Sequence, residues 1–239
     1  PLILTHGWPD SFYRYHKVIP MLTDVFDVVV PSMPGFGFSD RTALSSNAVA
    51  DLWVKLMAAL GYPRFIAEGG DMGTGITMAI ARQHPDSVLG IHLPGSEFPN
   101  GHEDRSTLSE AEQKFVDFIQ GWMFTDGAYA MVHITKPQTI AYALNDSPAG
   151  LAAWILSFIN TGAENNDVEK AFGNRDDLLT NLTIYWATQT TGSAARTYYE
   201  DAHAQMQQQA PPTRIAAPAA VAVYPTDAPF PRECTERTL

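Results

Sequence analysis

Residues 69–73 read Gly-Gly-Asp-Met-Gly and place a sharp turn between an apolar run, residues 64–67, and a helix-like segment, residues 74–81. Small residues on either side of such a turn let the helix start close beneath the strand, so the middle side chain projects into a cleft above the sheet. This order of strand, turn and helix is the outline of a nucleophile elbow, with Asp71 where serine is usual. The stretch therefore predicts a packed strand and helix with a carboxylate nucleophile between them.

Asp71 would face the positive end of the helix that follows it, and we expect this field to keep its carboxylate ionised. An ionised carboxylate needs no base for a first attack, whereas a serine does. A glycine-rich turn in which Asp71 only caps the helix explains the same residues. Other motifs have to decide between the two interpretations.

Strand-like and helix-like patterns alternate through the first part of the chain. Strands are predicted at residues 1–5, 26–30, 64–67 and 88–93, and helices at residues 47–60 and 74–81. This alternation predicts an α/β fold with a mostly parallel sheet covered on both faces.

From residue 96 to residue 204 the pattern becomes almost wholly helical, with amphipathic or apolar stretches at residues 110–124, 150–159 and 178–188. A strand pattern returns at residues 221–224. We therefore predict a core in two parts, residues 1–95 and 205–239, with an inserted helical cap at residues 96–204.

Composition excludes several function classes. The 239 residues are 45% hydrophobic, which suits one globular domain with an inserted subdomain. The 26 acidic and 15 basic residues give a net charge of −11, which argues against nucleic acid or an anionic membrane as a partner. The single cysteine, Cys234, excludes an internal disulfide framework and a cysteine-based zinc site, and no apolar run reaches transmembrane length. We expect a cytoplasmic protein without a metal or organic cofactor.

A second turn, His-Gly-Trp-Pro at residues 6–9, directly follows the first predicted strand. The backbone N–H of Trp8 in such a turn can point at a developing oxyanion, and the N–H of Met72 would supply a second donor. His6 could equally be an ordinary turn histidine.

These motifs together resemble the α/β-hydrolase epoxide hydrolases, in particular the microsomal-type branch and its bacterial relatives. The core resemblance is carried by residues 6–9, 34–40 and 69–71, and the cap resemblance by residues 135–139, 144–153 and 178–181. The resemblance implies an α/β-hydrolase fold with a helical cap. It also implies conversion of an epoxide to a vicinal diol through an ester on Asp71.

The resemblance further assigns Tyr129 and Tyr198 as the cap tyrosines that hold the epoxide oxygen, with Tyr199 as the neighbour most easily confused with Tyr198. A phenol has an ordinary pKa of about 10, so it can donate a proton at neutral pH. Asp227 matches the position of the acid that would orient a water-activating histidine, with Glu233 as a rival; either could be a loop carboxylate.

The histidine itself is expected on a Gly-Gly-His loop after one further strand, and the chain stops at Leu239 before that motif. We therefore interpret the chain as a fragment that lacks the first strands and the histidine-bearing segment, able to form the ester but not to release it. A pocket for a small apolar epoxide is expected around His6, Phe36 and Trp154, with Phe12, Trp8 and Tyr129 nearby. Water is the co-substrate, and homo-oligomerisation is left open.

Two departures from the family pattern concern the substrate range: Met72 stands where tryptophan is common, and Asp10 where glycine is usual. The alternatives are a haloalkane or haloacid dehalogenase, which uses the same aspartate, and a non-catalytic ligand-binding protein of the same fold. A dehalogenase would need a halide-binding donor, and the Met72 side chain has no N–H. The identity of the epoxide and the biological role, such as detoxification, do not follow from the sequence.

Overall fold

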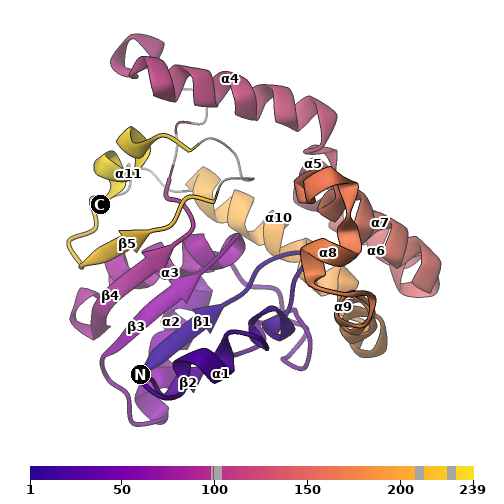
Figure 1. The fold of residues 1–239 in the computed structure, drawn as a ribbon, viewed down its shortest axis with the longest axis horizontal. Helices are drawn as coiled ribbons and strands as arrows, with labels where there is room; N and C mark the ends of the chain where they lie inside the picture. The colour runs from indigo at the N-terminus through magenta and orange to yellow at the C-terminus, as the bar shows by residue number, and fades with distance from the viewer. Residues whose placement is uncertain (98, 100–103, 208–212, 225–229) are drawn as a thin grey trace.

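The computed structural model in Figure 1 describes residues 1–97, 99, 104–207, 213–224 and 230–239. Its centre is a parallel sheet with the strand order β2-β1-β3-β4-β5. The strands are β1 (Leu2–Thr5), β2 (Val28–Val29), β3 (Phe65–Gly69), β4 (Val88–Leu93) and β5 (Ala219–Val221).

Helices cover both faces of the sheet, because successive side chains of a strand point to opposite sides. Leu2 and Leu4 of β1 pack with Tyr15 on the face where α1 (Ile19–Leu22) lies. Ile3 and its neighbours pack on the other face against α2 (Ser46–Ala59) and α3 (Met72–Gln83). The predicted α/β class, with a parallel sheet between helical layers, is confirmed.

Two predicted strands differ from the observed ones. The strand expected at residues 26–30 is ordered as a strand only at Val28–Val29, because β2 lies at the edge of the sheet and pairs only with the first residues of β1. The strand expected at residues 221–224 is observed at Ala219–Val221 instead. It pairs with β4, which ends at Leu93 opposite Val221, so in the described part of the chain residues 222–224 have no strand partner.

In chain order, seven α-helices follow β4 and precede β5 in the described part of the chain. They lie beyond the carboxyl ends of the strands (Figure 1). None of the described helices is both long and apolar enough to cross a lipid bilayer. The seven are α4 (Glu110–Thr125), α5 (Ala128–Thr135), α6 (Pro137–Asp146), α7 (Pro148–Gly162), α8 (Val168–Phe172), α9 (Arg175–Thr188) and α10 (Thr191–Gln207).

One of these helices, α10, caps the first turn of α2 in the core. The side chain of Ser45, at the N-cap position of α2, makes no capping hydrogen bond. The carboxylate of Asp201 on α10 instead accepts the backbone N–H of Ser46 at 2.5 Å and its hydroxyl at 2.8 Å. A carboxylate at a helix N-terminus is favourable, so this contact fastens α10 to the core.

Candidate active site

Asp71 lies at a strained turn between β3 and α3. Its φ of 56° and ψ of −123° are rare for a residue with a side chain, and such conformations cost roughly 1–3 kcal/mol. Its side chain makes no capping hydrogen bond to α3. Asp71 Oδ1 instead accepts the backbone N–H of Trp8 at 2.9 Å, and the N–H of Met72 also bonds to this carboxylate. The interpretation of Asp71 as a simple helix cap is therefore wrong.

Glycine is required at two positions where the backbone passes close to other atoms of the site. A Cβ atom on Gly7 would lie 2.2 Å from Asp71 Oδ1, and a Cβ atom on Gly73 would lie 2.1 Å from the carbonyl oxygen of Thr5. Both distances are far below van der Waals contact. Gly7 thus lets the turn after β1 reach the carboxylate, and Gly73 lets α3 start against β1.

Burial raises the pKa of Asp71 to about 6, although the N–H groups of Trp8 and Met72 act in the opposite direction. The sequence predicted an ionised carboxylate; the loss of hydration raises its pKa, but the value stays below neutral pH. Asp71 borders a cavity, so it is accessible to water on that side while protein surrounds the rest. It is ionised at neutral pH and gains a proton in mildly acidic solution.

An aromatic cluster stands over the same turn. The indole of Trp8 stacks on Tyr129 of α5 with ring centroids 4.8 Å apart, and Tyr198 of α10 lies 6.1 Å from Tyr129. The hydroxyls of the two tyrosines interact. Burial, followed by the negative charge of Asp71, raises the pKa of both hydroxyls above the ordinary value. Both phenols are therefore protonated and can donate.

Tyr199 points elsewhere. Its ring stacks on His203 at 3.7 Å and lies 5.6 Å from the guanidinium carbon of Arg196. Tyr198 therefore belongs to the cluster around Trp8, and its neighbour does not.

A cavity of about 240 Å³ borders Asp71, and Trp8, Tyr129 and Tyr198 are not among the residues that line it. Thr74 of α3 and Pro94 border it near the carboxylate, and side chains of α4 and of the C-terminal region form its outer wall. The wall is mostly apolar and consists of Phe115, Ile119, Val223, Tyr224 and Phe230. The ring of Phe115 packs edge-on against Phe230 with centroids 5.4 Å apart.

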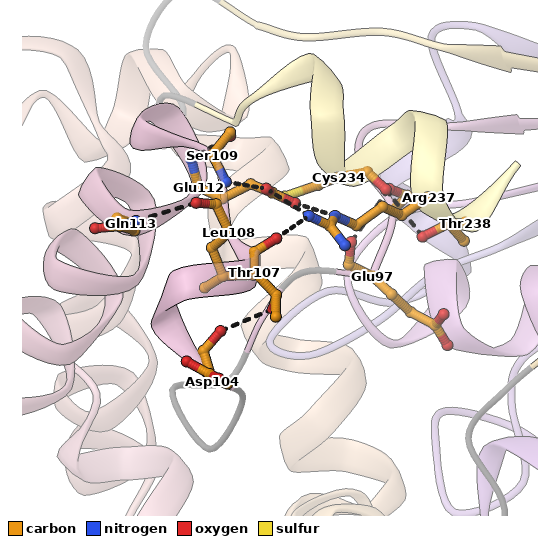
Figure 2. Close-up of polar contacts among 11 residues, drawn as sticks. Glu97, Asp104, Thr107, Leu108, Ser109, Glu112, Gln113, Cys234, Arg237 and Thr238 are labelled. Atoms are coloured by element: carbon orange, nitrogen blue, oxygen red, sulfur yellow. Dashed lines mark hydrogen bonds and ion pairs between the residues drawn. The ribbon is translucent and has the colours of Figure 1, made fainter.

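The start of α4 is fastened to α11 (Arg232–Thr238), as Figure 2 shows. Arg237 donates to both carboxylate oxygens of the fully buried Glu112, at 2.5 and 3.0 Å, and to the carbonyl oxygen of Thr107 at 2.8 Å. Glu112 also accepts the backbone N–H of Ser109, which completes a capping box. Burial alone would raise the pKa of Glu112, but the bonds from Arg237 and Ser109 outweigh it and lower the pKa.

The predicted pocket residues do not line this cavity. His6 and Phe36 are fully buried and pack edge to face at 5.1 Å. His6 Nε2 accepts the N–H of Met33 at 3.1 Å, and burial lowers the pKa of His6 to about 4, so the neutral ring braces the turn. Trp154 donates to His133 Nε2 at 3.1 Å behind the aromatic cluster, and Phe12 packs against the exposed Phe38.

The sequence offers two candidates, Asp227 and Glu233, for the carboxylate that would orient the histidine base. Asp227 lies outside the described residues. Glu233 lies in the first turn of α11 and is not among the residues that line the cavity. In the described ranges no three His, Cys, Asp or Glu side chains are grouped so that they could hold a metal ion.

Sequence reasoning did not find the side chains that fix the turn at Trp8 from the cap. Asn181 and Tyr185 of α9 are buried and donate to the carbonyl oxygens of Pro9 and Asp10, at 2.8 and 2.7 Å. The only signal was the resemblance of residues 178–181, which gave no role. The amphipathic pattern of residues 110–124 did include Phe115 and Ile119, but it did not indicate the cavity.

Comparisons with known proteins show the family and the fold. A family model described as the alpha/beta hydrolase fold matches residues 1–213. Epoxide hydrolase 1 of Oryctolagus cuniculus is 34% identical over 236 residues, covering 84% of this chain and 52% of that protein. Juvenile hormone epoxide hydrolase of Bombyx mori is 32% identical over 234 residues, covering 84% of this chain and 50% of that protein. The chain spans about half the length of these curated relatives.

Solved structures give the same result. The structure of Aspergillus niger epoxide hydrolase superimposes with a TM-score of 0.78 at 27% identity, covering 100% of this chain and 63% of that one. The juvenile hormone epoxide hydrolase of Bombyx mori gives a TM-score of 0.77, also at 27% identity.

Proposed function

Since this chain belongs to the alpha/beta hydrolase fold family, we propose that its protein is an epoxide hydrolase that forms a vicinal diol through an ester on Asp71. One observation carries the proposal. The carboxylate at the elbow accepts the N–H of Trp8, and the two partly buried, protonated phenols of Tyr129 and Tyr198 stand over the same turn. The similarity to epoxide hydrolases supports the same reaction.

In the first step a carboxylate oxygen of Asp71 attacks an epoxide carbon. The ring C–O bond breaks, and its electron pair leaves with the epoxide oxygen, which takes a proton from Tyr129 or Tyr198. The N–H of Trp8 holds Asp71 Oδ1, and we assign the new C–O bond to Oδ2. The products of this step are an ester on Asp71 and a hydroxyl on the adjacent carbon.

In the second step water attacks the carbonyl carbon of the ester. The carbonyl oxygen, now an oxyanion, rests on the N–H groups of Trp8 and Met72, which already surround the carboxylate. Collapse of this intermediate breaks the C–O bond to the substrate and restores Asp71. One proton of the water ends on the leaving oxygen, which completes the diol, and the other restores the tyrosine that gave up its proton in the first step. A histidine base oriented by Asp227 or Glu233 stays a prediction from the sequence resemblance.

The proposal is tested by incubating the chain with styrene oxide and measuring its intact mass and any diol. Asp71→Asn is compared with Asp51→Asn, which alters an exposed carboxylate paired with His84 at 2.6 Å. We expect an adduct of one substrate mass, or diol, with the parent and with Asp51→Asn only. Equal adduct on Asp71→Asn would contradict the proposal, and halide release from a haloalkane without epoxide opening would favour the dehalogenase alternative.

A further inference from the structure

We propose that Asn181 of α9 is a positioning residue that holds the oxyanion turn, residues 7–10, in register with Asp71. Helix α9 would then help to set the position of the hydrogen-bond donor to the nucleophile. The inference rests on the proposed function for its effect on the reaction. Its effect on the Asp71 carboxylate can be measured without any reaction.

Asn181 bridges two points on the chain just after β1. Its side chain is 1% exposed. Asn181 Nδ2 donates to the carbonyl oxygen of Pro9 at 2.8 Å, and Asn181 Oδ1 accepts the hydroxyl of Ser11 at 2.8 Å. One turn along α9, the hydroxyl of Tyr185 donates to the carbonyl oxygen of Asp10 at 2.7 Å. Two consecutive carbonyl groups of the turn region are thus bound by one helix of the cap.

The core also holds this turn, through His6. His6 Nε2 accepts the N–H of Met33, and His6 Nδ1 lies 3.1 Å from the carbonyl oxygen of Gly7. The oxyanion turn is therefore fixed between the loop at Met33 and helix α9. Without the contacts from α9, only the contacts of His6 would hold the turn. The backbone at Pro9 and Asp10 could then shift.

Such a shift would act on the hydrogen bond between Trp8 and Asp71. The Trp8 N–H that donates to Asp71 Oδ1 at 2.9 Å lies two peptide groups before the Pro9 carbonyl that Asn181 holds. Hydrogen bonds weaken steeply with distance and angle, and a displacement of about 1 Å at a reacting group can slow a reaction about a hundredfold. Asn181 would therefore set the rate at which Asp71 reacts without touching the substrate.

Other contacts of α9 make the proposal testable, because they do not depend on Asn181. Asp177, near the start of α9, pairs with Lys17 at 2.5 Å and accepts the hydroxyl of Tyr13 at 3.0 Å. The N-cap residue Asn174 accepts the backbone N–H of Asp177 at 2.8 Å. Asn174→Ala should destabilise the helix and leave the oxyanion turn untouched, so it is the matched control for a merely structural effect.

The experiment compares the parent, Asn181→Leu and Asn174→Ala by two readouts. The first is the rate of Asp71 alkylation by styrene oxide. The second is the midpoint pH of Asp71, followed by the infrared carboxyl band that Asp71→Asn lacks. We expect Asn181→Leu to slow alkylation at least about tenfold and to raise the midpoint, because the ionised carboxylate loses a donor. Asn174→Ala should lower the melting temperature and change neither readout.

An unchanged rate and midpoint in folded Asn181→Leu would overturn the inference, as would equal changes in Asn174→Ala. If the parent is not alkylated at all, the proposed function fails; a raised midpoint in Asn181→Leu would still support the positioning role, and an unchanged one would overturn it. If Asn181→Leu does not fold, Tyr185→Phe replaces it. That variant removes one hydroxyl and keeps the ring, and it should change both readouts in the same direction by less.

Discussion

Two sets of residues near Asp71 are held by different kinds of contact. We call Trp8, Tyr129 and Tyr198 the aromatic side, and the cavity wall at α4 the α4 side. On one side Trp8, Tyr129 and Tyr198 come from three separate elements, and buried hydrogen bonds from α9 fix the turn that carries Trp8. On the other side the wall of α4 contacts the cavity through apolar side chains and is fastened at its start by one ion pair to α11. Directional polar contacts define one position, whereas apolar packing tolerates several shapes.

This difference assigns separate tasks to the two sides. In the proposed reaction the aromatic side carries the groups that donate protons and hydrogen bonds, so changes there should alter the rate of ester formation. The α4 side carries no described group that takes part in the proposed chemistry, so changes there should alter which substrates bind and how tightly. Substitutions on each side test whether reaction rate and substrate binding are separated in this way.

The largest effect is expected when both phenol hydroxyls are removed. The double substitution Tyr129→Phe and Tyr198→Phe keeps the stacked rings but leaves no proton for the epoxide oxygen. Such donors typically contribute about 10²–10⁴-fold, so alkylation of Asp71 should slow by about that factor. Tyr199→Phe, which alters the neighbouring ring stacked on His203, should leave the rate unchanged. A rate within about twofold of the parent in the double variant would remove the tyrosines from the mechanism.

The next effect concerns pH. Only ionised Asp71 attacks, and its pKa is about 6 because burial raises it, with the charges of Asp10 and Arg14 nearby acting in opposite directions. The alkylation rate should fall about tenfold for each pH unit below 6. Between pH 7 and 9 it should be flat, because the pKa values of Tyr129 and Tyr198 are raised. A rate that is still constant at pH 5 would show that the pKa of Asp71 is not raised.

On the α4 side, Phe115→Ala enlarges the cavity next to Phe230. We expect the half-saturating concentration of styrene oxide to rise about tenfold, the usual size of an apolar pocket contact, while the rate at saturation changes less. Phe124→Ala is the matched control on the same helix, because Phe124 is 94% exposed. If the saturating rate falls more than the half-saturating concentration rises, the α4 wall takes part in the chemistry.

The smallest effect concerns the fastening of α4. Glu112 has a lowered pKa in the folded chain, so its contribution to stability is present above its unfolded pKa and is lost as the pH falls. Glu112→Gln should lower the free energy of unfolding at pH 7 by about 1 kcal/mol, since Arg237 is half exposed. The difference should shrink at pH 3. Glu110→Gln should show a smaller difference, because the pair of Glu110 with Lys114 lowers the pKa of Glu110 but is exposed to water. Urea unfolding at both pH values measures this.

The sequence predicted the elements whose signals are local. The elbow, the strands at residues 1–5 and 88–93 and the helices at residues 47–60 and 110–124 are found within two residues of their expected ends. Glycine spacing and apolar periodicity suffice for these features because the physical cause lies within the same short segment.

The remaining features depend on residues far apart in the chain. Nothing in the spacing of Asn181 and Pro9, 172 residues apart, indicates that they share a hydrogen bond. The pKa of Asp71 depends on how completely the folded chain removes water, which the helix-dipole argument from sequence left out. His6 and Phe36 were expected in the pocket because of their chemical type, yet close packing with Met33 and the turn buries them.

The most direct test of the account is to locate the ester. Trypsin cleavage at Arg64 and Arg82 releases residues 65–82 as one peptide, and its only carboxylate side chains are those of Glu68 and Asp71. After exposure of the folded chain to styrene oxide, fragmentation of this peptide should place the added mass on Asp71, and the adduct should be absent after unfolding in urea before exposure. An added mass on Glu68, or equal labelling of folded and unfolded chains, would contradict the account.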